Sequence, residues 1–192
     1  LPGTAWGVPG GPLPNPGGLS NLNNVSALIT NGVTNIAYTV GELAKKGAQH
    51  FLVPNMPDLG KTPDMLGTPA AAGLWLLSQV FNFYLAQAMG QLDAALTSAE
   101  IVQFDTMGAF NEVIGNPGAY GIRNVTQQCI QNYAACAADN FQWLFWDSVH
   151  PTTYAHRFLA AEFRAAIPEP ETIILLAVGL LGIFVTRRKR IA

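Results

Sequence analysis

Charged side chains are scarce in this 192-residue sequence: they make up 11% of it, whereas 49% of the residues are hydrophobic. Four of the ten basic residues stand together at 187–190, so residues 1–166 hold six basic and ten acidic side chains. Residues 1–166 thus carry a net negative charge and offer no basic surface to a phosphate backbone, so we expect no nucleic-acid partner. The length and apolar content are sufficient for one sizeable hydrophobic core.

Cysteine is also scarce, with Cys129 and Cys136 as the only two. Two thiols without a nearby histidine or a second cysteine pair fall short of a zinc ligand set, so we expect no metal site. The tail described below indicates export, and an even cysteine count in an exported protein favours a disulfide between these two residues. Two reduced thiols in a cytosolic protein are the alternative.

An initiating methionine and an export signal are missing as well. The sequence starts at Leu1 and continues through a stretch rich in proline and glycine. We interpret residues 1–19 as a loop in a chain whose beginning is not included. The lack of an export signal is then uninformative.

Apolar periodicity predicts helices alternating with short strands over residues 20–166. Ser20 is a possible N-cap of the first helix and Gly47 a suitable terminator, and Thr68 followed by Pro69 predicts the start of another long helix. The expected elements are helix 20–46, strand 51–53, loop 54–63, helix 68–98, strand 101–104, helix 108–114 and helix 152–166. This order predicts an α/β fold with a mostly parallel sheet, of which two clear strands form only a part.

The end of the chain has the most specific organisation. Residues 173–185 form an unbroken apolar run, and the basic cluster at 187–190 follows almost at once. The run is shorter than the ~20 residues of a comfortable transmembrane helix, and a buried core helix is the alternative. Its freedom from charge and the cluster behind it favour a membrane helix over 172–186, with the cluster in the cytoplasm.

Together with Pro168-Glu169-Pro170, this tail resembles a PEP-CTERM sorting signal. The resemblance makes residues 167–192 a sorting segment and implies processing by an exosortase-type membrane protease. It also implies an exported protein of the periplasm or cell envelope, anchored in the inner membrane by the helix before processing.

His150 stands out among the three histidines because Asp147 precedes it by three residues. A carboxylate beside one imidazole nitrogen fixes the tautomer and stabilises the imidazolium that forms when the other nitrogen takes a proton. Asp147 would then hold Nδ1–H and leave Nε2 as a general base. Pro151 places the pair on a loop before the last helix. Two surface loop residues, with Asp147 capping a turn, are the alternative.

Other polar residues have plainer interpretations. His156 falls on the last helix and reads as a partly exposed structural residue, and His50 has no acidic neighbour in sequence. We expect Asp58 and Asp64, in the proline-rich loop after the first strand, to cap or stabilise turns.

Residues 145–152, Phe-Trp-Asp-Ser-Val-His-Pro-Thr, resemble the last sequence block of SGNH/GDSL hydrolases. Residues 46–60 and 116–129 resemble earlier stretches of the same family, in the same order. The resemblance extends over about 20–165 and implies the C-terminal portion of a three-layer α/β/α, flavodoxin-like sandwich. It implies Asp147 and His150 as catalytic residues of a Ser-His-Asp triad, an ester substrate and no cofactor.

The sequence departs from this family in lacking the Gly-Asp-Ser block of the nucleophile and the blocks that supply the oxyanion hole. Ser148 would have to fold back onto His150, so we do not expect it to be the nucleophile. We therefore expect the nucleophile upstream of Leu1, and this portion to be inactive alone.

Trp143, Phe145 and Trp146 crowd the segment before the Asp–His pair. They could form a wall for an acyl group, but core packing is the default for large aromatic rings. The expected function of the intact protein is hydrolysis of a carboxylic ester. The alternative is a non-catalytic protein of the cell envelope or extracellular matrix that binds a surface polymer through a degenerate hydrolase fold.

Overall fold

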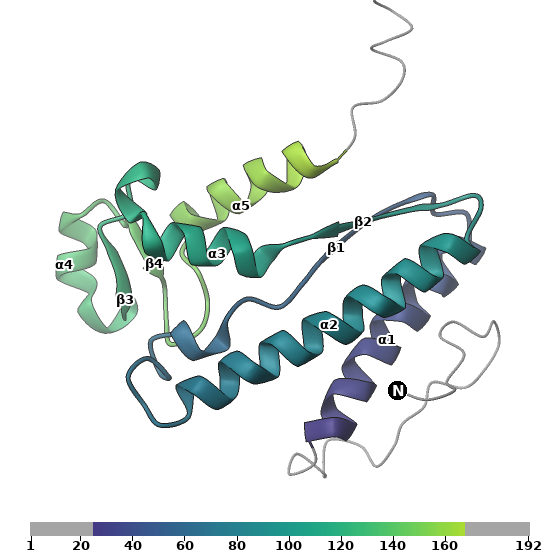
Figure 1. Cartoon of the computed structure of the whole chain (residues 1–192). Helices are drawn as coiled ribbons and strands as arrows, with labels where there is room; N and C mark the ends of the chain where they lie inside the picture. Colours follow the sequence, from purple (N-terminus) through teal and green to yellow (C-terminus); the bar gives the residue numbers. More distant parts are fainter. Residues whose placement is uncertain (1–24, 168–192) are drawn as a thin grey trace, which may run out of the picture.

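The computed structural model describes residues 25–167, and Figure 1 shows their arrangement. The loop expected over 1–19 and the membrane helix expected over 172–186 lie outside the described residues. Within 25–167, no helix is both long and apolar enough to cross a membrane.

Two parallel strands, β1 (His50–Pro54) and β2 (Glu100–Phe104), lie at the centre of the fold. The helices α1 (Val25–Lys45) and α2 (Ala71–Ala95) lie side by side below them in Figure 1. On the other side lies α5 (Thr153–Ala166), whose Phe163 ring packs edge-on against Phe104 of β2. The expected α/β class with parallel strands is therefore confirmed.

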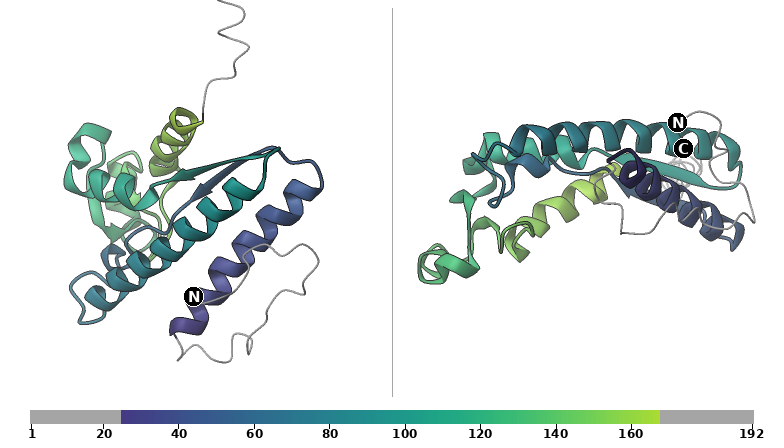
Figure 2. Two further views of the ribbon diagram at one scale, coloured as in Figure 1. Left: turned by 45° about the vertical axis from the view of Figure 1, so that its right-hand side comes forward. Right: turned by 90° about the horizontal axis from the view of Figure 1, so that it is seen from below.

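The largest core lies between α1, α2 and the first strand pair. Apolar residues at helical spacing on α1 meet a matching row on α2, and the buried members are Ile29, Val33, Ala37, Val40, Val53, Leu85, Ala88, Met89, Leu92 and Ile101. A Cβ at Gly32 would lie 2.9 Å from the Phe81 ring, so the missing side chain lets the two helices approach closely. Figure 2 shows α1 beside part of α2.

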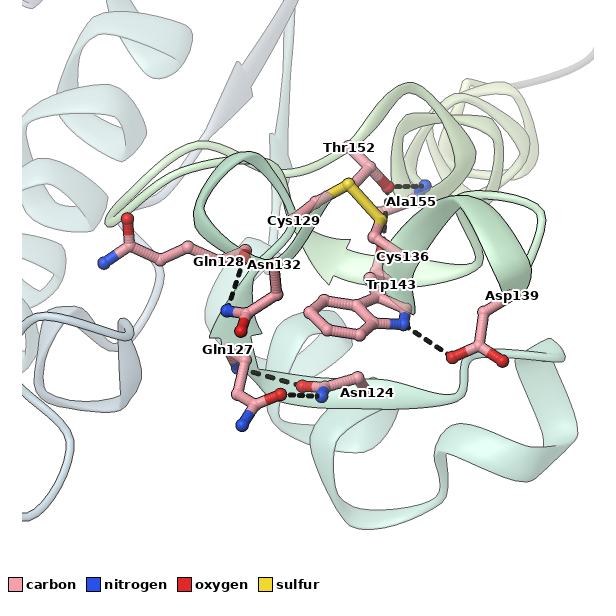
Figure 3. The surroundings of a disulfide bond; sticks show 10 residues. All are labelled: Asn124, Gln127, Gln128, Cys129, Asn132, Cys136, Asp139, Trp143, Thr152 and Ala155. Atoms are coloured by element: carbon pink, nitrogen blue, oxygen red, sulfur yellow. Dashed lines mark hydrogen bonds between the residues drawn. A yellow bond between two sulfur atoms is a disulfide. The ribbon is translucent and has the colours of Figure 1, made fainter. Parts of the chain in front are cut away.

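A second parallel pair, β3 (Asn124–Gln128) and β4 (Trp143–Phe145), forms with the short helix α4 (Tyr133–Ala138) between them. The apolar periodicity predicted no element between residues 114 and 152, so β3, α4 and β4 were missed. A disulfide joins Cys129 to Cys136, as predicted. Both cysteines pack with Trp143 in a small buried cluster, which supplies the apolar contact that the polar β3 lacks (Figure 3).

The observed element ends correct two expectations. α2 begins at Ala71 rather than at Pro69, because the Thr68 hydroxyl donates to the Met65 carbonyl in the preceding turn instead of capping the helix. The helix α3 (Thr106–Gly115) begins two residues earlier than predicted, because the side chain of Asp105 accepts the Gly108 N–H as an N-cap. α3 ends at Gly115, one residue after the predicted end, and α5 begins at Thr153, one residue after the predicted start.

Candidate active site

A short loop, residues 146–151, joins β4 to α5 and carries the predicted Asp–His pair. All three residues of β4 are buried. The loop is closed at its base because the Trp146 N–H donates to the His150 carbonyl at 2.8 Å, and the Thr152 N–H donates to the Leu144 carbonyl at 2.9 Å. The buried strand therefore holds both ends of the loop.

Thr152 fixes where the loop ends and α5 begins. Its buried hydroxyl accepts the Ala155 N–H at 3.1 Å, which is an N-cap bond, and donates to the Trp143 carbonyl at 2.6 Å. Pro151, just before it, forms a bridge with Phe145 of β4. One side chain thus ties the helix start to the strand that precedes the loop.

The Asp147 carboxylate organises the loop from within. Its Oδ1 accepts the N–H of Val149 at 2.9 Å and that of His150 at 2.7 Å, while Oδ2 lies 2.8 Å from Nδ1 of His150. The two backbone donors and then the His150 ring lower the pKa of Asp147 from 3.8 to about 2. The carboxylate is consequently ionised at neutral pH.

An ionised carboxylate beside Nδ1 selects the tautomer of His150 that carries its proton there. Nε2 is then left with a free lone pair. The side chain of His150 is 76% exposed, so an incoming group can reach Nε2 from solvent. The structure thus brings together the two residues that the sequence singled out, in the geometry of an oriented general base.

No serine hydroxyl within residues 25–167 hydrogen-bonds to the His150 ring. Ser148 lies in the same loop, and Ser78 is buried where its hydroxyl accepts the Leu59 N–H at 3.3 Å. Neither forms the contact with the base that an activated nucleophile needs.

His50 and Asp58 pair with groups other than Asp147 and His150, and His156 is an exposed residue of α5. His50 is exposed at the start of β1, 3.5 Å from Glu100 on β2, a pairing that depends on strand register and was missed in the sequence. Asp58 caps a short 3-10 helix (Leu59–Lys61) by accepting the Gly60 N–H, as expected. No group of three potential metal ligands gathers within the described part of the chain.

A contact that sequence analysis missed joins the ends of β1 and β2. The Asn55 side chain donates to Asp105 at 2.9 Å and accepts the Met107 N–H at 2.9 Å. Both side chains follow a parallel strand directly, which is the signal that could have identified them, because the carboxyl ends of parallel strands meet at one edge. The bond fixes the loop after β1 to the start of α3.

The aromatic residues before the pair divide into two kinds. Trp143 and Phe145 are buried in the core, as expected, and the Phe145 ring packs edge-on against Phe110 of α3. Trp146 is exposed, so core packing is the wrong interpretation for this residue. Its backbone N–H donates to the His150 carbonyl and thereby helps to close the loop.

The sequence is similar to several known proteins. A "GDSL esterase/lipase" of Arabidopsis thaliana is 26% identical over 132 residues, covering 59% of this chain and 36% of the relative. The "thermolabile hemolysin" of Vibrio parahaemolyticus is 26% identical over 161 residues, covering 74% of this chain and 38% of the relative.

A third relative is an uncharacterized protein of the trpE-trpG intergenic region of Pseudomonas putida. It is 29% identical over 171 residues, covering 82% of this chain and 28% of the relative. The chain therefore spans between 28% and 38% of the length of these three relatives.

Two family models match the sequence. Residues 166–190 match the PEP-CTERM protein-sorting motif, so the resemblance seen in the tail is confirmed. Residues 15–163 match the model of GDSL-like lipases and acylhydrolases. This second match covers more than half of the sequence, and the chain therefore belongs to the GDSL-like lipase/acylhydrolase family.

Proposed function

We propose that the protein is a serine ester hydrolase in which His150 acts as general base and Asp147 orients it. The 2.8 Å contact between Asp147 Oδ2 and His150 Nδ1 carries the proposal. Nε2 of His150 takes the proton of a serine hydroxyl as its oxygen attacks the ester carbonyl, and returns that proton to the departing alcohol. Water then repeats the sequence on the acyl-enzyme, while the Asp147 carboxylate stabilises the imidazolium in both halves.

The nucleophile of this proposal is a serine outside residues 25–167, together with the donors of the oxyanion hole. The described residues would form the C-terminal portion of a three-layer α/β/α sandwich of the SGNH type. The open edge of β1 supports this view, because among the described residues β1 pairs with β2 alone. An unpaired strand edge presents backbone N–H and C=O groups with which further strands can pair. On this proposal residues 25–167 do not hydrolyse esters by themselves.

The PEP-CTERM match supports a proposal about location. The protein is exported, held in the inner membrane by a helix over 172–186, and released or transferred within the cell envelope by an exosortase-type protease. Cell fractionation tests this directly. We expect the protein in the membrane or envelope fraction, and a wholly cytosolic distribution would contradict the proposal.

Covalent labelling with a fluorophosphonate tests the hydrolase proposal, because this probe reacts with a serine that a neighbouring base activates. We expect the product of the complete reading frame to be labelled and the His150→Ala variant to lose the label. His50→Ala is the matched control, since it removes another exposed histidine, the first residue of β1. Equal labelling of all three proteins would refute the role of His150. No labelling of any would favour a non-catalytic protein that binds a surface polymer of the cell envelope or matrix.

A further inference from the structure

A pocket of about 340 Å³ lies between the turn of residues 139–142, after α4, and the first residues of α5. Neither Asp147 nor His150 lines it. The volume falls within the range of roughly 300–1,000 Å³ that is usual for ligand pockets. The lining includes Asn140 and Phe141 from the turn, Trp146 at the end of β4, and Thr153, Tyr154 and Arg157 from α5.

The backbone of the turn is strained at the two residues that line the pocket. Asn140 and Phe141 both have a left-handed conformation, with φ of 54° and 57°. Asparagine tolerates this region, whereas phenylalanine rarely adopts it. Phe141 is held there because its N–H donates to the Cys136 carbonyl at 2.9 Å, next to the disulfide. Strained residues of this kind gather at ligand sites, and here the strain places an aromatic ring at the pocket.

Aromatic rings at this pocket stand partly in water. Phe141 is 39% exposed and Trp146 37% exposed, and the Tyr133 ring extends the surface by packing edge-on against Phe141 at 5.7 Å. Such rings suit a ligand that has apolar faces and a polar edge, because its C–H groups can pack on the rings while its hydroxyls keep their hydrogen bonds. A pyranose sugar has this character. The amide of Asn140 and the hydroxyl of Thr153 add groups that can hydrogen-bond to sugar hydroxyls.

The charge at the pocket is positive. Arg157 is the one charged side chain among the described residues that line it. Its Cζ lies 5.6 Å from the centre of the Tyr154 ring, and it forms no ion pair with any residue of 25–167. A guanidinium binds a carboxylate through two parallel hydrogen bonds. This cation is therefore available to a carboxylate that a ligand brings.

We propose that this pocket binds a uronic acid, a pyranose sugar that carries a carboxylate, as a unit of an acidic polysaccharide. The sugar ring packs on Phe141 and Trp146, and its carboxylate pairs with Arg157. The site goes beyond the proposed ester hydrolysis and does not depend on it, because neither Asp147 nor His150 lines the pocket. Binding here would hold the protein on an acidic glycan.

Calorimetry on the product of the complete reading frame tests the class of ligand. The probes are two uronic acid oligomers, trigalacturonate and trimannuronate. Maltotriose is the comparison that has sugar rings without carboxylates, and triglutamate has carboxylates without sugar rings. We expect at least one uronate to bind about tenfold or more tightly than either comparison. No binding of either uronate, or equal affinity for maltotriose or triglutamate, would overturn the proposal.

Two arginines of α5 test the role of the charge. Arg157→Gln should raise the dissociation constant of the uronate by about tenfold or more. Arg164→Gln removes another exposed arginine of the same helix, which does not line the pocket, and should leave the dissociation constant unchanged. Equal weakening in both variants would show a general effect of charge and would overturn the site.

Two phenylalanines test the role of the ring. Phe141→Leu keeps an apolar side chain without a flat face and should raise the dissociation constant by about threefold or more. Phe83→Leu makes the same change at an exposed position of α2 and should have no effect. An unchanged dissociation constant in Phe141→Leu would overturn the stacking of the sugar on this ring.

The His150→Ala variant separates this site from the proposed active site. It should bind the uronate as tightly as the parent, because His150 does not line the pocket. Loss of binding in His150→Ala would place the sugar at the Asp–His pair and overturn a separate site. Binding by a protein that hydrolyses no ester would refute the proposed function and keep the uronic acid site.

Discussion

The carboxylate of Asp147 contacts both the backbone N–H and the imidazole ring of His150. Its Oδ1 accepts the His150 N–H at 2.7 Å, and its Oδ2 lies 2.8 Å from His150 Nδ1. The bond to the backbone sets where the histidine stands, and the bond to the ring sets which nitrogen faces outward. Position and tautomer of the proposed base therefore depend on a single side chain, and the two effects can be separated by substitution.

Asp147→Asn tests that separation. The amide oxygen can still accept the two backbone N–H groups, so the loop should keep its shape. The amide NH₂ would donate to Nδ1 and force the proton onto Nε2, the wrong tautomer for a base. We expect kcat for ester hydrolysis by the complete protein to fall by about 10³–10⁴-fold. A fall of less than tenfold would show that the carboxylate does not orient the histidine.

The low pKa of Asp147 predicts acid sensitivity. Because the folded-state pKa is about 2 and the reference value is 3.8, ionised Asp147 stabilises the fold above pH 4. That contribution is lost as the pH falls through the interval from 4 to 2. The thermal midpoint of the parent protein should therefore decline more between pH 5 and pH 2.5 than that of Asp147→Asn. Parallel declines would mean that the carboxylate is not stabilised in the folded protein.

The disulfide closes a short segment, since Cys129 and Cys136 are seven residues apart. Loop-closure entropy for this length gives about 2 kcal/mol of stability. The double variant Cys129→Ala/Cys136→Ala should lose about that much free energy of unfolding in urea. Dithiothreitol should destabilise the parent by a similar amount and leave the double variant unaffected. If the reductant acts equally on both proteins, its effect does not come from this bond.

Thr152 should be the most sensitive side chain around the loop. Thr152→Val removes the N-cap of α5 and leaves the buried Trp143 carbonyl without its hydroxyl donor. We expect a loss of about 2–3 kcal/mol in the free energy of unfolding. Thr152→Ser keeps the hydroxyl and should retain most of the stability, and Thr153→Val, at an exposed neighbour, is the control. Equal losses for the valine and serine variants would show that the hydroxyl bonds are not what matters.

Sequence reasoning succeeded where the signal is local. Thr152 after Pro151 marked the start of α5, and the apolar spacing of residues 25–43 predicted the helix α1. It failed where structure depends on distant partners. β3 has no apolar alternation and becomes a strand only because β4 pairs with it beside a disulfide.

The site shows the same division. Asp147 and His150 are three residues apart, so their contact is a matter of local turn geometry that a motif can reveal. Asn55 and Asp105 are fifty residues apart, and their bond follows from the pairing of β1 with β2. The pocket of Phe141 and Arg157 likewise depends on how the turn after α4 meets α5, which no pattern within either segment encodes.

The role of His150 is tested most directly by ester hydrolysis. The measurement compares kcat/KM for p-nitrophenyl butyrate between the product of the complete reading frame and its His150→Ala variant, with His50→Ala as control. We predict hydrolysis by the parent and by His50→Ala, and a loss of about 10³-fold or more in His150→Ala. Hydrolysis that survives in His150→Ala at the rate of the parent would contradict the assignment of His150 as the base.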